Sequence, residues 1–167
     1  MWKQLFQALI LGNQNNAKRN FIAQKLAQSY IYEDEGIDAL FPDFKTKVEH
    51  LIKRMKVLKK PIILSEGFRS FKTQKAYYAK GRTKTGKIIT QAKEGQSYHQ
   101  YGLAADLIFK RYGWNPPSGW WDILGVEAKK LGLEWGGDWK FRDVAHVQYR
   151  PLNVHWRELK SYFTRSS

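Results

Sequence analysis

The chain has 167 residues, of which 43% are hydrophobic, and this suits one globular domain with a sizeable core. It contains no cysteine, so disulfides, thiolate zinc sites and cysteine nucleophiles are excluded. A formal net charge of +14 favours anionic partners, but charge alone does not separate nucleic acid, anionic lipid and cell-wall polymer.

Residues 1–36 are predicted to form an N-terminal helical extension, because apolar residues recur at helical spacing on both sides of the break GNQNN. Residues 1–32 contain basic but no acidic side chains, so this segment either packs on the domain or lies on a membrane surface. The N-terminus resembles a signal peptide poorly, since it lacks a small-residue cleavage site. The sequence has no apolar run of about 18 residues, so no transmembrane helix is predicted.

Residues 37–150 mix helical and strand patterns without regular repetition, which predicts an α+β domain. The expected helices are FPDFKTKVEHLIKRMKVLKK, SFKTQKAYYAKG and WWDILGVEAKKLG, and the expected strands are PIILSEGF, AADLIFKR and AHVQY. The polar segment RTKTGKIITQAKEGQS is expected to be a loop beside a substrate groove, and LEWGGDWK an aromatic loop. Residues 151–167 are expected to form a basic, helical C-terminal tail.

The stretch SYHQYGLAAD places His99 and Asp106 seven positions apart. On one straight strand this odd separation would point them to opposite faces, so a turn at Gly102 is needed to make the two side chains converge. The spacing fits either two ligands of a metal ion or a hydrogen-bonded structural pair.

A catalytic zinc ion usually takes three protein ligands, so a third must come from elsewhere in the chain. His146, in the predicted strand AHVQY, is the natural candidate, and His155, in the basic tail, is the alternative. Asp143 stands three residues before His146, where a carboxylate beside the metal could take a proton from water and pass it to a leaving amine.

Three segments carry a family resemblance. SYHQYGLAAD has the pattern S-x-H-x-x-G-x-A-x-D, EGFRSFKTQ contains R-S-x-x-x-Q, and LEWGGDW is followed by DVAH. In this order and spacing, from about Ile37 to Tyr149, the chain resembles the zinc DD-/LD-peptidases related to the VanY D-alanyl-D-alanine carboxypeptidases. It is most similar to their L-alanyl-D-glutamate endopeptidase branch, which includes phage endolysins.

The resemblance implies a small antiparallel sheet flanked by helices, as in the DD-peptidase/Hedgehog-like zinc fold. It implies that Zn²⁺ is bound by His99, Asp106 and His146, with Asp143 as general base and acid. Many relatives have glutamate at the position of Asp143, so the shorter side chain leaves the subfamily open.

Four further roles are implied by the resemblance. Arg69 would hold a substrate carboxylate or the developing oxyanion, with a surface salt bridge as the alternative. Gln74 and Ser97 would support the site, and Trp139 would shape the groove; packing or ordinary hydrogen bonding is the alternative for all three.

The expected function is a zinc-dependent peptidoglycan hydrolase that cleaves the L-alanyl-D-glutamate bond of the stem peptide, as a bacteriolytic phage endolysin does. A D-alanyl-D-alanine carboxypeptidase is the alternative, because the same metal site serves both reactions. A non-enzymatic binder of an anionic polymer is the second alternative, and the intact Asp143 argues against it.

The expected partners are the stem peptide and anionic cell-envelope polymers, with membrane contact through the N-terminal helices. No specific nucleic acid is expected, because the sequence has no helix-turn-helix or RNP-like motif. We expect a monomer that acts at the bacterial cell wall. It would be made in the cytoplasm and released to the wall, as a phage lysin is, or exported by an unrecognised route.

Overall fold

The computed structural model describes residue 17 and residues 36–163. The predicted N-terminal helical extension therefore lies almost wholly outside the described residues. Among the residues described, no helix has the length and apolar character needed to cross a membrane.

The elements follow one another along the chain in the α+β order expected from the sequence. The α-helices are α2 (Pro42–Val57), α3 (Phe71–Ala79), α4 (Trp120–Lys130) and α5 (Trp156–Phe163). The strands are β1 (Ile62–Glu66), β2 (Ala104–Phe109), β3 (Glu134–Trp135) and β4 (His146–Gln148). Short 3₁₀ helices are η2 (Tyr98–Tyr101), η3 (Gly136–Asp138) and η4 (Pro151–Asn153).

The four strands form one antiparallel sheet in the order β1-β2-β4-β3. Asp106 lies opposite His146 on one side and opposite Glu66 on the other. A register shift between Leu64 and Glu66 makes this second pairing possible, because the bulged strand gains one residue and turns the next side chain toward its partner. The register therefore brings Glu66, Asp106 and His146 into one row across the sheet.

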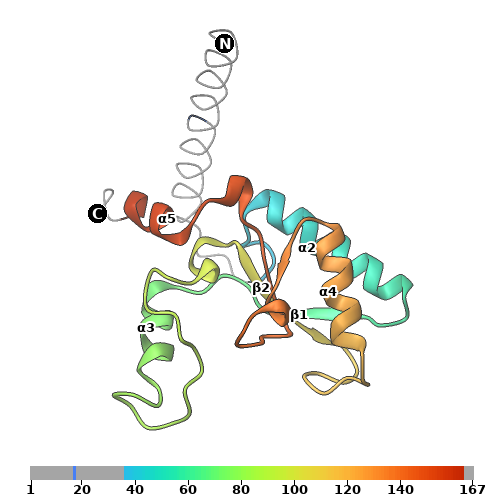
Figure 1. The fold of residues 1–167 in the computed structure, drawn as a ribbon, viewed down its shortest axis with the longest axis horizontal. Coiled ribbons are helices and arrows are strands. Elements are labelled where there is room, and N and C mark those ends of the chain that lie inside the picture. The colour runs from blue at the N-terminus through green and yellow to red at the C-terminus, as the bar shows by residue number, and fades with distance from the viewer. Residues whose placement is uncertain (1–16, 18–35, 164–167) are drawn as a thin grey trace.

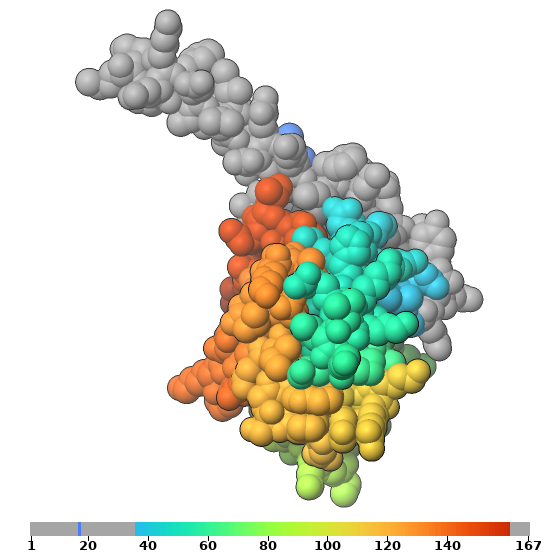
Figure 2. All heavy atoms as spheres, turned by 90° about the vertical axis from the view of Figure 1, so that its right-hand side faces the viewer, coloured from blue at the N-terminus to red at the C-terminus, as the bar shows by residue number. Residues whose placement is uncertain are grey.

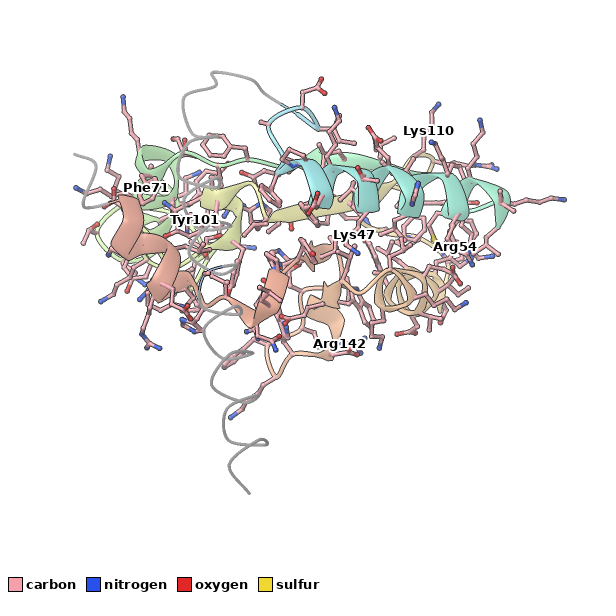
Figure 3. The ribbon with its side chains drawn as sticks, turned by 90° about the horizontal axis from the view of Figure 1, so that it is seen from above. Lys47, Arg54, Phe71, Tyr101, Lys110 and Arg142 are labelled. Atoms are coloured by element: carbon pink, nitrogen blue, oxygen red, sulfur yellow. The ribbon has the colours of Figure 1, made fainter. Side chains whose placement is uncertain are left out.

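Helices α2 and α4 lie side by side over one part of the molecule, as Figure 2 shows. Four side chains of α2 are completely buried: Phe44, Val48, Leu51 and Met55. Each such burial stabilises the fold by roughly 1.5–3 kcal/mol before the loss of chain entropy is counted. Arg54 of α2 also pairs with Glu127 of α4, and Figure 3 shows Arg54 beside that helix.

Helices α2 and α4 lie on one side of the strands and leave the other side to the candidate site (Figure 1). Figure 1 shows α3 and the loop that follows it on one side of the strands, and α2 and α4 on the other. The loop, residues 80–97, contains no regular strand or helix, as the sequence predicts.

Two features of the C-terminal part go beyond the sequence analysis. The predicted aromatic loop contains the two-residue strand β3, which pairs with β4 through Trp135 and Val147. The predicted helical tail, residues 151–167, includes α5. Two residues of the tail, Val154 and Leu159, are buried in the core. The division between domain and tail at residue 151 stays a prediction. Residues on both sides of it contribute to the core.

Candidate functional site

Three side chains far apart in the sequence meet on the sheet. His99 Nε2 lies 3.3 Å from His146 Nδ1 and 3.4 Å from Asp106 Oδ1, and His146 Nδ1 lies 3.1 Å from Asp106 Oδ1. Gly102 makes this convergence possible, because its left-handed φ of 61° turns the chain between η2 and β2. His155 is not part of the cluster, so His146 is the histidine that completes it.

Each histidine has its second ring nitrogen held by a hydrogen bond. His99 Nδ1 donates to the carbonyl oxygen of Gly67 at 2.6 Å, which leaves Nε2 as the free lone pair. His146 Nε2 lies 3.2 Å from Gln148 Oε1, and Gln148 Nε2 donates to Glu134 at 2.7 Å, which orients that amide. Hydrogen bonds of this kind fix the tautomer and ring orientation of metal-binding histidines.

The three donor atoms fit a zinc ion. Zinc binds histidine nitrogen and carboxylate oxygen at about 2.0–2.2 Å in tetrahedral sites, so two of its donors lie about 3.3–3.5 Å apart. The three observed separations, 3.1, 3.3 and 3.4 Å, are close to that edge length. Burial raises the pKa of Asp106, but its close contacts with the rings of His146 and His99 outweigh burial and hold the pKa far below its usual range. The carboxylate is therefore charged and available to a cation.

Asp143 lies at the rim of the same site. Its backbone NH donates to the carbonyl oxygen of Gly136 at 2.9 Å, and its own carbonyl oxygen accepts from the NH of His146 at 3.2 Å. The residue is exposed, yet the surrounding protein partly desolvates the carboxylate and so raises its pKa. A raised pKa suits a group that both takes and returns a proton.

Gly136 permits this close approach of two loops. A Cβ atom at Gly136 would lie 2.5 Å from the backbone oxygen of Asp143 and 3.1 Å from Cβ of His146. The second glycine of the pair, Gly137, lies against Trp135, since a Cβ there would be 2.1 Å from the ring. Trp135 in turn donates its ring NH to Val144 at 2.8 Å, which ties the WGGDW segment to the strand that carries His146.

A cavity of about 630 Å³ lies over the cluster. All three donor residues and Asp143 line it, as do the predicted residues Arg69, Ser97 and Trp139. The ring of Trp139 is 4.9 Å from that of His146. Exposed apolar side chains stand on both rims, with Ile88 and Ile89 in the loop after α3 and Phe141 after η3. The cavity therefore combines a few convergent polar groups with apolar side chains, as ligand-binding sites commonly do.

Gln74 does not line this cavity, although it is completely buried. Its Oε1 accepts from Arg69 Nη1 at 2.9 Å, and its Nε2 donates to the carbonyl oxygen of Ala92 at 2.7 Å. It thus connects the arginine to the loop that forms one rim, and its supporting role in the site stays a prediction.

Sequence reasoning missed two residues that hold the site together. Glu66 binds Arg69, and its only sequence signal is the opposite charge three positions before the arginine. Gln148 binds His146, and strand alternation could have found it, because residues two apart share a face.

Two family models match the chain, and both are described as D-alanyl-D-alanine carboxypeptidase. One matches residues 90–149, and the other, VanY, matches residues 38–115. The peptidoglycan L-alanyl-D-glutamate endopeptidase CwlK of Bacillus subtilis strain 168 is 44% identical over 103 residues, which cover 54% of this chain and 61% of that relative. The chain thus spans less than two thirds of the length of this relative.

Solved structures share the fold. The LD-carboxypeptidase LdcB superposes with a TM-score of 0.52 at 27% identity, covering 77% of this chain and 72% of its own. The L,D-carboxypeptidase DacB from Streptococcus pneumoniae gives 0.53 at 26% identity, with coverages of 77% and 73%. The vancomycin-resistance D,D-pentapeptidase VanY, solved in complex with Zn(II), gives 0.53 at 15% identity, with coverages of 73% and 78%.

Proposed function

We propose that this chain, which matches two family models described as D-alanyl-D-alanine carboxypeptidase, is a zinc-dependent peptidoglycan hydrolase of that family that cleaves the L-alanyl-D-glutamate bond of the stem peptide. The observation that carries the proposal is the triangle of donor atoms from His99, Asp106 and His146 at the base of a peptide-sized cavity. The choice of bond is supported by the 44% identity to an L-alanyl-D-glutamate endopeptidase.

His99, Asp106 and His146 would hold the zinc ion, and a bound zinc ion supplies Lewis acidity toward the scissile carbonyl and toward water. Asp143 then takes a proton from the attacking water as the new carbon–oxygen bond forms. When the carbon–nitrogen bond breaks, Asp143 returns that proton to the departing nitrogen, so the carboxylate ends as it began. No covalent bond to the chain forms in this scheme.

Arg69 and Trp139 have supporting roles in this proposal. Arg69 lines the cavity 3.8 Å from the carboxylate of Asp106, and the N–H groups that it does not use for Glu66 and Gln74 can stabilise negative charge that develops on the scissile carbonyl oxygen. Trp139 covers His146 from the cavity side and limits where the peptide can lie. Ser97 lines the same wall and can hydrogen-bond the peptide backbone.

A D-alanyl-D-alanine carboxypeptidase is the second candidate, and the description of both family models favours it. Digestion of purified muropeptides separates the two, with products assigned by mass spectrometry, with and without chelator and after zinc is added back. Fragments cut between L-alanine and D-glutamate support the endopeptidase. Free D-alanine as the sole product contradicts it, and full activity in metal-free protein contradicts the zinc requirement.

We further propose that the chain acts at the bacterial cell wall as a monomer and reaches it as a phage endolysin does. The net charge of +14 supports attraction to anionic envelope polymers. Contact of the N-terminal segment with a membrane is part of the same proposal, since residues 1–32 carry basic and no acidic side chains.

A further inference from the structure

The guanidinium group of Arg69 is already paired with a carboxylate of the chain itself. Glu66 accepts two hydrogen bonds from it, from Nε to Oε1 at 2.7 Å and from Nη2 to Oε2 at 2.5 Å. This two-point contact is the geometry by which arginine recognises a carboxylate ligand. Glu66 therefore occupies the face of Arg69 that a substrate carboxylate would otherwise use.

Other neighbours hold the guanidinium in this position. Nη1 donates to Gln74 at 2.9 Å, and the ring of Tyr77 lies 4.9 Å from the guanidinium carbon. Arginine has five N–H donors, and three are engaged in these bonds, which leaves two. Arg69 is only 9% exposed, so it has little room to turn toward a different partner.

The bulge in β1 creates this pair. It places Glu66 opposite Asp106, so two carboxylates lie on either side of the arginine, with Asp106 at 3.8 Å from Nη2. Glu66 balances the charge of Arg69, and a bound zinc ion would balance that of Asp106. A carboxylate brought beside Arg69 would therefore meet the negative charge of Glu66 at a guanidinium group that is already paired, whereas a neutral group would meet no such repulsion.

We propose that Glu66 is a specificity-determining residue that makes the site prefer an uncharged carboxamide to a free carboxylate on the α-carbon of the residue after the scissile bond. This inference rests on the proposed function. In a stem peptide that continues through the side-chain carboxyl of D-glutamate, the α-carboxyl group remains next to the cleaved nitrogen as a carboxylate or a carboxamide. A carboxamide offers an N–H to Glu66 and an oxygen to a remaining N–H of Arg69, and so matches the pair as a carboxylate cannot.

Two product dipeptides test the inference by calorimetric titration of the zinc-loaded full chain: D-glutamate linked through its γ-carboxyl to L-lysine, and the same dipeptide with an α-carboxamide. Cleavage of the two matching stem peptides, compared as kcat/KM, gives a second measurement. We expect the wild type to favour the carboxamide about tenfold in both. Glu66→Gln, which removes the charge at nearly constant volume, is expected to favour the carboxylate by a similar factor.

Further variants identify the residue responsible. In Glu66→Gln combined with Arg69→Gln the acquired preference for carboxylate should disappear, and Glu49→Gln on α2 should behave as the wild type does. If Glu66→Gln fails to unfold cooperatively, Glu66→Asp, which keeps the charge on a shorter side chain, should show a preference reduced from that of the wild type.

A wild type that binds or cuts the carboxylate form better overturns the inference, as does a folded Glu66→Gln protein with the wild-type ratio. A wild type that cuts neither peptide contradicts the proposed function instead.

Discussion

His99 and His146 present different ring nitrogens to the same point: Nε2 of His99 and Nδ1 of His146 are 3.3 Å apart. Each ring is turned this way by an acceptor on its other nitrogen, the carbonyl oxygen of Gly67 in one case and Gln148 in the other. The two lone pairs and the charged Asp106 therefore face one another without a proton between the two rings. Such an arrangement favours a bound cation.

Zinc should stabilise the folded chain independently of any activity. A ligand that binds only the folded state adds about 2.7 kcal/mol to the free energy of unfolding when its concentration is 100 times its Kd. We expect the melting temperature to rise on titration with zinc in the wild type and in His50→Ala, where the exposed histidine of α2 is removed. His146→Ala should lose the rise, and a rise of equal size in that variant would contradict the assigned ligands.

Gln148→Ala should weaken zinc binding although Gln148 is not a ligand. It removes the acceptor of His146 Nε2, which lets the ring turn and the wrong nitrogen carry the proton. Loss of such a partner typically costs about 10–100-fold in metal affinity. Competition with a chromophoric chelator measures the effect, and an unchanged affinity would show that Gln148 does not orient the histidine.

Asp143→Asn should lower kcat by roughly 10²–10⁴-fold, because an amide cannot take up and return a proton. Zinc affinity, measured by the same competition, should stay close to that of the wild type, since Asp143 is not among the three donors. Asp38→Asn is the matched control, because it removes an exposed carboxylate that is distant from Asp143 in the sequence, and it should leave kcat unchanged. Full activity in Asp143→Asn would exclude this residue as the general base.

Gly136→Ala should reduce activity by about 10²-fold, because a displacement of about 1 Å of a catalytic group has a cost of that order. The added methyl group would lie 2.5 Å from the backbone oxygen of Asp143, so the rim that carries Asp143 must move. Measuring both kcat and the melting temperature separates displacement of the rim from a loss of overall stability. Unchanged activity in a folded variant would mean that the rim tolerates the shift.

Glu127→Gln should make stability less dependent on pH. Hydrogen bonds from Arg54 and Lys130 lower the pKa of Glu127 in the fold. A lowered pKa contributes stability that is present above the unfolded pKa and lost as the pH falls through the folded pKa. We expect the variant to be about 1–2 kcal/mol less stable at pH 7, with a difference that shrinks as the pH falls below the unfolded pKa of about 4.3 and vanishes only below the lower folded pKa.

Urea unfolding of both proteins at several pH values measures this difference. Glu49→Gln, a substitution on the same layer of helices, should keep a small and constant difference of about 0.5 kcal/mol or less. A constant difference for Glu127→Gln would contradict the pairing.

The sequence predicts the periodic elements well, for physical reasons, and it also predicts that His99, Asp106 and His146 lie together. The helix over 42–57 has a regular apolar stripe, and its four buried residues all belong to that stripe. The need for a turn at Gly102 follows from the odd spacing of His99 and Asp106, and the positive φ confirms it. Strand β3 escaped prediction because two residues, Glu134 and Trp135, are too few for alternation to show.

Tertiary register was out of reach from the sequence. The bulge that turns Glu66 toward Asp106 depends on how β1 pairs with β2, and the local sequence gives no sign of it. The sequence predicts a substrate group as the partner of Arg69, with a surface salt bridge as the alternative, and the structure shows a salt bridge to Glu66, although a largely buried one. Whether Arg69 also acts on substrate stays a prediction.

The position of Trp139 has a practical consequence for spectroscopy. The residue is 38% exposed and lines the cavity, and its ring lies 4.9 Å from the ring of His146. Indole fluorescence responds to nearby charge and to solvent, so a cation or peptide arriving beside His146 changes the emission of this tryptophan. Subtraction of the spectrum of Trp139→Phe from that of the wild type isolates its signal from the other six of the seven tryptophans. The protein thus contains its own optical reporter at the site, and occupancy can be followed in real time without a dye.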